Sequence, residues 1–499
     1  MNDPLKLLPP NDRRRLRIAI IGSGFGGLGM ALQLQDAGFT NFTIFEKADE
    51  VGGVWRENTY PGAACDVPSQ LYSFSFWPNP NWTRSYSPQH EILDYLKMCA
   101  QQGGLLDRVR FNAEVTHLTY SDEHRNWTLT LASGESDVFD VVIPALGQLH
   151  HPLVPALPGR SQFGGPAFHS ARWDHSIDWS EKRVAVLGTG ASAIQFVPWL
   201  VDRAAHVTVF QRNAPWIIRK IDREIGPRER SWYGRFPFLQ RSQRNFTFWL
   251  LDTVMFSHGG SQWRQQMIAR MARKNLETDV RDPALRSMLT PTEPIGCKRI
   301  LFSSEWYPAM TRPNVTLIPQ GVDSIDATGV VAGGRHVDAD VIVYGTGFRT
   351  TNFMMPMTVT GADGIDLQEQ WKDGPEAFLG VTIPNMPNMF LLYGPNTNLG
   401  HNSIIAMLEA QFGYVIQALE TLNRLENGVI AVRPEISAAY NAELQSELAG
   451  TVWAAGCDSW YTNEAGRNTN NWSDRVKRYQ RLLSRWNVAD YDLFGLRSS

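Results

Sequence analysis

The first residues with a definite chemical use are three glycines that follow a short apolar run at 17–21. Gly22 permits the tight turn after a strand, Gly24 lets the backbone approach a pyrophosphate, and Gly27 lets helix and strand pack closely. The helix-like stretch that follows would direct its free N–H groups at the phosphates. Glu46, 22 residues after Gly24 (46 − 24), ends the next apolar run, where it would accept hydrogen bonds from ribose hydroxyls. We therefore predict a dinucleotide site here.

A second turn of the same kind follows the apolar run at 183–187 and contains Gly188, Gly190 and Ala193. Counting 22 residues from Gly190 (212 − 190) reaches Arg212, where the first unit has a carboxylate. A carboxylate would repel a 2′-phosphate, whereas a guanidinium binds one in a bidentate way. The second site is therefore predicted to take NADPH and not NADH. The alternative is that Arg212 is a surface arginine at a strand end.

Two such fingerprints in one chain are typical of an FAD site followed by an NAD(P)H site. Gly53 and Trp55 come soon after the first unit and offer flexible backbone near a phosphate chain. The segments 345–348 and 394–403, the latter containing Asn396, follow apolar strands, where α/β sheets bind ligands. We assign FAD to the first site and expect these segments to lie beside it.

The elements that must position both turns are predicted to be βαβ units of parallel sheet, each read as strand, glycine turn, helix and strand. The expected fold class is α/β, with two Rossmann-like dinucleotide-binding domains, for FAD and NADPH, and a helical insertion. The expected parts are 1–150 (FAD-binding domain, first part), 151–218 (NADPH-binding domain, first part), 219–290 (helical insertion), 291–345 (NADPH-binding domain, second part) and 346–499 (FAD-binding domain, second part, with a C-terminal loop).

The insertion is rich in Trp, Phe, Arg and Met between about residues 219 and 289, with helical periodicity. We expect it to pack over the cleft between the nucleotide domains. Most aromatic side chains of 232–263 are expected in the core, and a minority at the cleft. The apolar segment 245–256 is interrupted by Asp252 and falls far short of the ~20 apolar residues that a spanning helix needs.

Composition excludes other classes of protein. The net charge of −3 over 499 residues gives no electrostatic case for nucleic acid or an anionic membrane as the main partner. The N-terminus has no apolar stretch of signal-peptide length. We expect no membrane span, although attachment to a membrane by a surface stays open. We also expect a monomer or homodimer.

The four cysteines, Cys65, Cys99, Cys297 and Cys457, are scattered and include no Cys-x-x-Cys pair. This pattern argues against a disulfide framework, a structural zinc site and a redox-active dithiol. We expect a reducing, cytoplasmic setting and no metal.

A longer pattern lies just before the second unit, at 163–174. It fits F-x-G-x-x-x-H-x-x-x-W-[P/D] with Phe163, Gly165, His169, Trp173 and Asp174. The sequence thereby resembles the Baeyer–Villiger monooxygenases, whose signature this is and whose flavin-containing and N-hydroxylating relatives lack it in full. The segments 60–76, 297–307 and 387–403 are similar to this family's flavin-adjacent loop, its lysine–arginine segment and its C-terminal flavin loop. The resemblance covers essentially the whole chain and is weakest in the insertion and the tail.

The resemblance implies an FAD-dependent oxidoreductase that uses NADPH and O2 and a small ketone. It would insert one oxygen atom next to the carbonyl, giving an ester or lactone through a C4a-peroxyflavin. By the same resemblance Arg299 is the active-site arginine, Asp66 the carboxylate beside the flavin that orients it, and Lys298 joins Arg212 at the 2′-phosphate. Arginine suits an oxyanion because it does not lose its proton. A structural Asp–Arg salt bridge is the alternative.

In this family the motif acts at a hinge and not in bond making, so we expect His169 to be structural and not an acid or base. His169 and Trp173 would share a face if their segment were helical. The tail segment 460–472, rich in Asn, Gly and Thr, is expected to be mobile and to order over the active site when NADP+ binds.

Three other functions use the same layout. A sulfur or nitrogen oxygenase would use the same intermediate and could also accept a sulfide. A disulfide reductase needs a dithiol beside the flavin, which the cysteine spacing does not supply. A non-catalytic flavoprotein that senses NADPH would have no need of both fingerprints together with Asp66 and Arg299.

Overall fold

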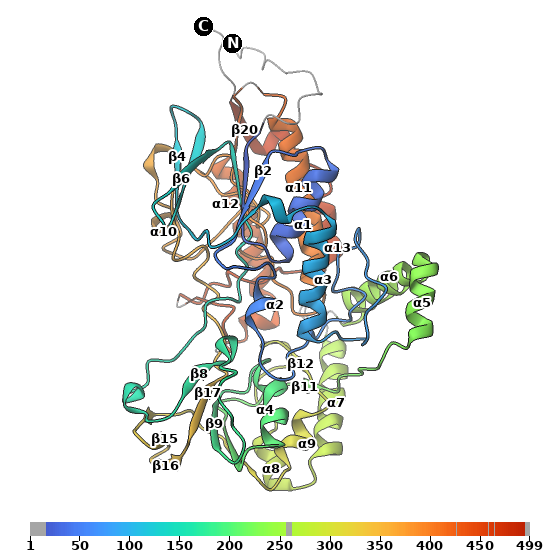
Figure 1. Cartoon of the computed structure of the whole chain (residues 1–499), viewed down its shortest axis with the longest axis vertical. Coiled ribbons are helices and arrows are strands. Elements are labelled where there is room, and N and C mark those ends of the chain that lie inside the picture. Colours follow the sequence, from blue (N-terminus) through green and yellow to red (C-terminus); the bar gives the residue numbers. More distant parts are fainter. Residues whose placement is uncertain (1–15, 256–261, 426, 458, 464, 495–499) are drawn as a thin grey trace.

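The structure of the protein, a computed structural model, describes residues 16–255, 262–425, 427–457, 459–463 and 465–494. In these residues two parallel sheets form the centres of two lobes, one above the other in Figure 1. The first sheet has the order β3-β2-β1-β7 and consists of β1 (Ile18–Ile21), β2 (Phe42–Phe45), β3 (Val109–Arg110) and β7 (Val141–Pro144). The second has the order β13-β10-β9-β17-β8 and consists of β8 (Ala167–His169), β9 (Arg183–Leu187), β10 (His206–Phe210), β13 (Val315–Ile318) and β17 (Val341–Tyr344).

The central strands form where the sequence predicts them, because their apolar side chains are buried on both faces. β1, β7 and β17 are buried at all four positions, which is the pattern of a parallel sheet covered by helices. The covering helices are α1 (Phe25–Asp36), α3 (Gln89–Gln102) and α11 (Ile404–Leu422) in the first lobe, and α4 (Ala193–Val201) and α9 (Trp306–Met310) in the second. The predicted α/β fold with two Rossmann-like units is confirmed.

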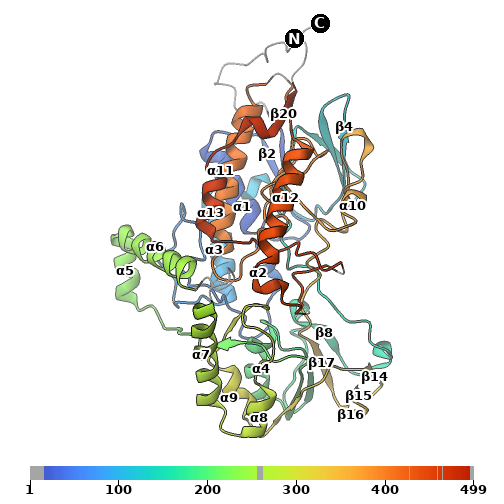
Figure 2. The same ribbon diagram turned by 180° about the vertical axis from the view of Figure 1, so that it is seen from behind.

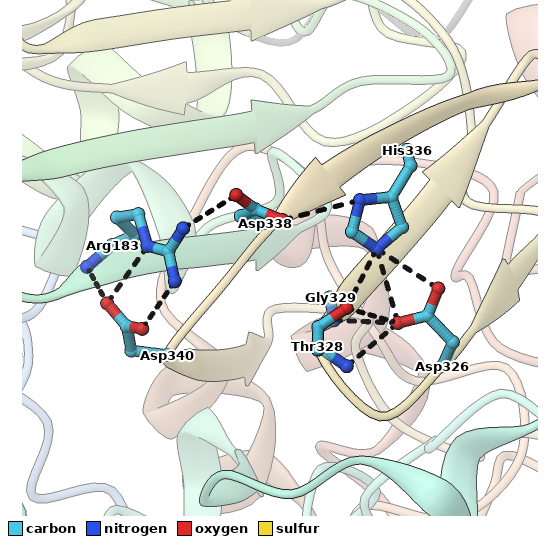
Figure 3. Close-up of polar contacts among 7 residues, drawn as sticks. All are labelled: Arg183, Asp326, Thr328, Gly329, His336, Asp338 and Asp340. Carbon is cyan, nitrogen blue, oxygen red and sulfur yellow. Dashed lines mark hydrogen bonds and ion pairs between the residues drawn. The ribbon is translucent and has the colours of Figure 1, made fainter.

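An exposed polar network fixes the start of β9 against its neighbour β17 (Figure 3). The Arg183 backbone N–H and Nη2 donate to the carboxylate of Asp340, at 2.8 Å each, and Nη1 donates to Asp338 at 2.7 Å. The chain of contacts continues from Asp338 through the ring of His336 to Asp326. It holds the strand register at the end of the sheet opposite the glycine turn.

The first lobe repeats this clamp, which supports a common plan for the two units. The Arg17 N–H donates to Asp140 at 2.7 Å, just as the Arg183 N–H donates to Asp340. The carbonyls of the two arginines accept the N–H groups of the same two aspartates, at 2.9 and 2.8 Å. In both lobes an arginine that begins the glycine-turn strand therefore sets the register of the neighbouring strand.

One predicted strand does not form. The apolar segment 388–394 lies beside β7, and the N–H groups of Phe390 and Leu392 donate to Val142 and Pro144. The segment is nevertheless irregular, because Asn388 (φ +53°) near its start lies in the left-handed region. It still brings the following loop, 394–403, to the carboxyl end of the first sheet.

Smaller elements complete both lobes. One further sheet has the order β18-β4-β5-β6, from β4 (Val115–Ser121), β5 (Asn126–Leu131), β6 (Ser136–Phe139) and β18 (Thr358–Thr360). The other strands are β11 (Ile217–Ile218), β12 (Leu301–Phe302), β14 (Ser324–Ile325), β15 (Gly329–Ala332), β16 (Arg335–Asp338), β19 (Val429–Val432) and β20 (Tyr491–Phe494). Short helices are α2 (Val54–Glu57) and α10 (Leu367–Gln370), and Figure 2 shows α12 (Pro434–Ala449) and α13 (Val476–Leu482) on the side of α11.

The insertion is helical, as predicted. It comprises α5 (Pro227–Arg235), α6 (Pro237–Thr253), α7 (Gln262–Asp279) and α8 (Pro283–Met288). The helices α7 and α8 pack on the second lobe, whereas α5 and α6 project sideways from the molecule (Figures 1 and 2). The prediction that the aromatic side chains of 232–263 lie in the core is wrong for six of them, which are 42–63% exposed: Trp232, Phe236, Phe238, Phe246, Trp249 and Trp263. Among the described helices none is both long enough and apolar enough to cross a membrane.

Candidate active site

The two glycine turns are built in the same way. Gly22 has φ +103° and Gly188 has φ +104°, a region that favours glycine. A Cβ at Gly22 would lie 2.7 Å from the carbonyl oxygen of Ala145, and a Cβ at Gly188 would lie 2.6 Å from that of Gly345. Each turn therefore touches the loop after the neighbouring strand, at the carboxyl ends where such sheets bind ligands.

The other predicted fingerprint residues lie around these turns. Gly24 caps α1 and Gly27 lies in its first turn, while Gly190 precedes α4, which Ala193 begins. The backbone of Gly53 lies against that of Gly24, since a Cβ at Gly53 would be 3.1 Å from the Gly24 Cα.

Glu46 is buried and its carboxylate is bonded to Ser23 of the first turn, while its contact with ribose hydroxyls stays a prediction. Its carboxylate accepts hydrogen bonds from the N–H and hydroxyl of Ser23, at 3.0 and 2.6 Å, and from the N–H of Ala48 at 3.0 Å. Arg56 adds an ion pair at 3.2 Å. Sequence reasoning missed Ser23 and Arg56, because neither belongs to the glycine fingerprint. They hold the carboxylate in place at the end of β2.

In the second unit the structure gives Arg212 neighbours that the sequence did not reveal. Arg212 is exposed, and the residue after it, Asn213, donates to Glu293 Oε1 at 3.1 Å. Lys298 Nζ lies 2.9 Å from the same oxygen. Glu293 therefore holds Lys298 close to Asn213, the residue that follows Arg212.

His169 of the signature motif is buried and has a partner at each ring nitrogen. Nε2 lies 2.9 Å from the carbonyl of Gly347, to which it donates, and Nδ1 accepts the N–H of Ala171 at 3.1 Å. Burial lowers the pKa of His169 to about 4, against the opposing effect of the Gly347 carbonyl. A neutral imidazole with both nitrogens occupied is a structural link between β8 and the loop after β17.

The rest of the motif surrounds this link. Trp173 packs against Phe168, Trp179 and Phe196, with ring centroids 5.2–5.7 Å apart. The condition under which His169 and Trp173 would share a helical face is not met, because the segment between them is a single 3₁₀ turn at Ser170–Arg172. The remaining members lie outside the turn: Phe163 beside the second sheet, Gly165 against the carbonyl of Asp340, and half-buried Asp174, which accepts from Ser176.

Arg299 and Asp66, far apart in sequence, form a bidentate pair. Arg299 Nη2 lies 2.8 Å from both carboxylate oxygens of Asp66, and Nε lies 3.1 Å from Oδ2. Both side chains are partly buried, at 31% and 21% exposed. The charge of Asp66 raises the pKa of Arg299 above its ordinary value, although burial opposes the rise. The guanidinium is therefore permanently charged and fixed in orientation.

Two further segments converge on Arg299. Its Nη1 donates to the carbonyl of Leu399, in the loop 394–403, at 3.4 Å. Tyr461 of the tail also adjoins it: burial raises the pKa of Tyr461 to about 12, and the Arg299 charge and a backbone hydrogen bond from Arg299 oppose the rise. The arginine segment, the 60–76 loop, the 394–403 loop and the tail thus meet at one guanidinium.

The tail is packed against the 394–403 loop along its asparagines. The N–H groups of Asn396 and Asn398 donate to the carbonyls of Thr469 and Asn470, each at 2.9 Å. Asn396 Nδ2 donates to the carbonyls of Asn468 and Asn471, at 2.9 and 3.1 Å. These hydrogen bonds hold residues 468–471 against the neighbouring loop, and the ordering of 460–472 when NADP+ binds stays a prediction.

A disulfide between Cys297 and Cys457 joins the arginine segment to the same tail. The prediction of unpaired cysteines is wrong at these positions, because the fold brings together residues 160 apart in sequence, with Cα atoms 6.3 Å apart. Cys65 and Cys99 are free and buried, and burial raises the pKa of the Cys65 thiol above its ordinary value. The disulfide lies two residues from Arg299, so it also ties down the candidate active site.

Asp252, the acid that interrupts the apolar segment, is a buried junction. Its Oδ1 accepts the N–H of Val476 at 2.8 Å and lies 3.4 Å from both His401 Nε2 and Asn402 Nδ2. Burial alone would raise the pKa of Asp252, but the His401 contact and the N–H groups of Val476 and Lys477 bring it below its ordinary value. Asp252 therefore joins α6, the 394–403 loop and α13. The sequence signal for this junction was a single acid that interrupts the apolar segment 245–256.

Sequence similarity to known proteins identifies the family of this chain. The flavin-binding monooxygenase-like family matches residues 15–270. A Baeyer–Villiger monooxygenase of Streptomyces coelicolor is 42% identical over 96% of this chain and 92% of its own, and one of Pseudomonas aeruginosa is 41% identical over 97% and 92%. The chain belongs to the Baeyer–Villiger monooxygenases. The family predicted from the signature motif is therefore confirmed.

Solved Baeyer–Villiger-type structures have the same fold as this monooxygenase. An oxidised steroid monooxygenase bound to NADP is 29% identical, with a TM-score of 0.83 over 94% of this chain and 97% of that one. A cyclohexanone monooxygenase from Rhodococcus sp. Phi1 bound to NADP+ is 25% identical, with a TM-score of 0.86 over 96% and 99%. The prediction of a flavin- and NADPH-dependent monooxygenase is confirmed, and neither a sulfur or nitrogen oxygenase nor a disulfide reductase is favoured.

The residues of this Baeyer–Villiger monooxygenase fit FAD at the first turn. Gln148, just beyond β7, donates from Nε2 to the carbonyls of Tyr393 and Gly394, at 3.2 and 3.4 Å, while its buried Oε1 has no protein partner. The buried Oδ1 of Asn396 also has none. Two unpaired acceptors near the first turn suit a ligand that carries N–H and O–H groups. Trp55 lies alongside, donating from Nε1 to the Tyr72 hydroxyl at 3.2 Å.

Replacing Asp252 by alanine should lower the free energy of unfolding of this monooxygenase by about 3 kcal/mol, because it leaves a buried histidine and two N–H groups without their acceptor. Since the folded pKa of Asp252 is depressed, its contribution is present above the unfolded pKa and is lost as the pH falls through the folded pKa. Urea unfolding of the native protein and the variant across acidic pH measures both effects. Exposed Asp107→Ala is the matched control; equal losses for the two variants would contradict the assignment.

Proposed function

We propose that the protein inserts one oxygen atom of O2 next to the carbonyl of a small ketone, giving an ester or lactone, with FAD at the first turn and NADPH at the second. The observation that carries this proposal is the Asp66–Arg299 pair where four segments meet, at 2.8 Å. Bound FAD, once reduced by NADPH, supplies the oxygen activation. The residues of the chain bind the cofactors, orient the Arg299 guanidinium and stabilise the negative charge that develops on oxygen.

In this proposal Arg299 is the catalytic cation. Oxygen insertion develops negative charge on oxygen, and a fixed, permanently protonated guanidinium stabilises that charge without reorganising. Asp66 holds the guanidinium through its Nε and Nη2 atoms, and Nη1 is turned to the Leu399 carbonyl. Asp66 thus positions the catalytic cation beside the flavin.

At the second turn we propose that Arg212 and Lys298 bind the 2′-phosphate of NADPH. Lys298 is a single ammonium that is also paired with Glu293, whereas the guanidinium of Arg212 can bind a phosphate in a bidentate way. Arg212 would therefore make the larger contribution. Gly188, Gly190 and Ala193 would hold the pyrophosphate at the start of α4, and Gly22, Gly24, Gly27, Glu46, Gly53, Trp55 and Asn396 would hold FAD.

We propose that the signature motif links the two nucleotide-binding domains. The proposed parts of the chain are 1–150, 151–218, 219–290, 291–345 and 346–499. The neutral His169 ring joins β8 to Gly347, close to the junction after residue 345. Its two hydrogen bonds fix the position of that junction without adding charge. A cytoplasmic location fits the use of NADPH.

Aerobic turnover of linear, cyclic and aromatic ketones and one sulfide, under ¹⁸O₂, tests the proposal. We expect NADPH-dependent formation of an ester or lactone that carries one labelled oxygen. Arg299→Ala, with FAD content measured, serves as the control for uncatalysed product. Oxidation of the sulfide with no ester from any ketone would contradict the proposed reaction.

A further inference from the structure

The helices α5 and α6 place an aromatic surface on the outside of the protein. We define the hairpin face as Trp232, Phe236, Phe238, Phe246 and Trp249, whose exposed fractions are 60%, 42%, 63%, 62% and 54%. Figures 1 and 2 show both helices projecting from the side of the molecule, so the face is open to the surroundings. A cluster of large exposed aromatic side chains on one projecting element marks an interaction surface.

The inner side of α6 combines apolar packing with polar contacts, since Leu239, Phe248 and Leu251 pack against the core of the first lobe. Gln240 and Asp252 are the buried residues of α6. Gln240 donates to the carbonyl of Asn79 at 2.6 Å, and Arg244 donates to the carbonyl of Ser73 at 2.7 Å. The inner face is thus held both by apolar packing and by specific hydrogen bonds. The aromatic outer face is not needed to hold α6 in place.

The aromatic residues of α6 form one continuous side of the helix. At 100° per residue, Phe238, Phe246 and Trp249 lie within about a quarter of the helix circumference. The rings of Phe246 and Trp249 are 6.2 Å apart, and so are those of Phe236 and Phe238 across the α5–α6 junction. The hairpin face therefore contains two aromatic pairs, together with exposed Trp232 on the adjoining helix α5.

The charge around this face is positive, although the whole chain carries −3. Arg228, Arg235 and Arg241 are exposed on the same two helices. The acids of α5 and α6 are Glu229, which is paired with Arg223 at 2.7 Å, and the buried Asp252. A second copy of the chain would bring these arginines against their own equivalents, whereas an anionic surface neutralises them.

We propose that the hairpin face docks on an anionic lipid bilayer. The aromatic rings enter the interfacial region between headgroups and acyl chains, and Arg228, Arg235 and Arg241 bind lipid phosphates. Aromatic residues combined with basic residues on a helix that lies in the membrane plane are the combination that such attachment uses. The near-neutral balance of the whole chain does not oppose this docking, because screening limits electrostatic attraction to the local charges within about 8–10 Å.

Co-sedimentation of the FAD-loaded full chain with vesicles tests the proposal. We expect binding to vesicles of phosphatidylcholine and phosphatidylglycerol in a roughly 3:1 ratio, little binding to phosphatidylcholine alone, and loss of binding in about 0.5 M NaCl. The triple variant Phe238→Ser, Phe246→Ser, Trp249→Ser should bind the anionic vesicles about tenfold more weakly or worse, because the inserted apolar area is removed.

The matched control is Trp199→Ser, since Trp199 is 54% exposed but lies on α4 in the second lobe. It should bind anionic vesicles like the unmodified protein. Retained NADPH oxidation shows that the triple variant is folded, since none of its three residues belongs to the active site. Absence of binding to anionic vesicles, or equal binding by the triple variant, would overturn the proposal. Self-association without vesicle binding, abolished by the triple variant, would assign the face to a second copy and overturn it equally.

Discussion

Replacing Arg299 by alanine should lower ketone oxygenation by about a hundredfold or more while FAD remains bound. The guanidinium is the fixed charge at the meeting point of the Asp66, 394–403 and tail segments, and its removal leaves the glycine-turn contacts untouched. Reduction by NADPH should persist, so the oxygen consumed would leave as hydrogen peroxide in place of ester. Oxygen uptake, peroxide release and ester yield, measured per NADPH oxidised, separate these outcomes.

Two matched variants show whether charge or placement matters at this position. Arg299→Lys keeps a positive charge but cannot make the bidentate pair with Asp66, so it should restore only part of the ester yield. Asp66→Ala keeps the arginine and loses its orientation, so it should lower oxygenation less than Arg299→Ala. An Arg299→Ala variant with near-normal ester yield would reduce the Asp66–Arg299 pair to a structural salt bridge.

The second large effect is expected at the NADPH site. Arg212→Ala should raise the KM for NADPH by roughly 30-fold, equivalent to about 2 kcal/mol for a lost charge-assisted phosphate contact. The KM for NADH, which lacks the 2′-phosphate, should change little. Steady-state NADPH and NADH oxidation by the native protein and the variant gives both constants.

The control for this experiment is Arg335→Ala, which removes an exposed arginine on β16 of the same lobe. It should leave both constants unchanged. Lys298→Ala should have a smaller effect than Arg212→Ala, because Lys298 is already paired with Glu293 at 2.9 Å. Equal catalytic efficiency of the native protein with NADPH and NADH would refute the role of Arg212.

Sequence alone determined the two βαβ units and the positions of the turns. The runs 17–21 and 183–187 became β1 and β9, and the turn residues Gly22 and Gly188 have the positive φ values that the fingerprint requires. These features are local: a strand, a tight turn and a helix start are set by neighbouring residues. The same holds for the signature motif, which identified the family because its residues lie within one short segment.

Only the tertiary structure decided which distant segments meet at Arg299. Asp66 lies 233 residues away, and Cys297 and Cys457 are 160 apart, so neither pairing has a spacing pattern to read. The prediction that the aromatic residues of α6 lie in the core was wrong for a related reason. Their helical periodicity shows that they share a side, but the inward side is fixed by Arg244, Phe248 and Leu251, whose partners lie in other parts of the chain. Local periodicity fixes an element, whereas long-range hydrogen bonds and packing fix which of its faces is buried.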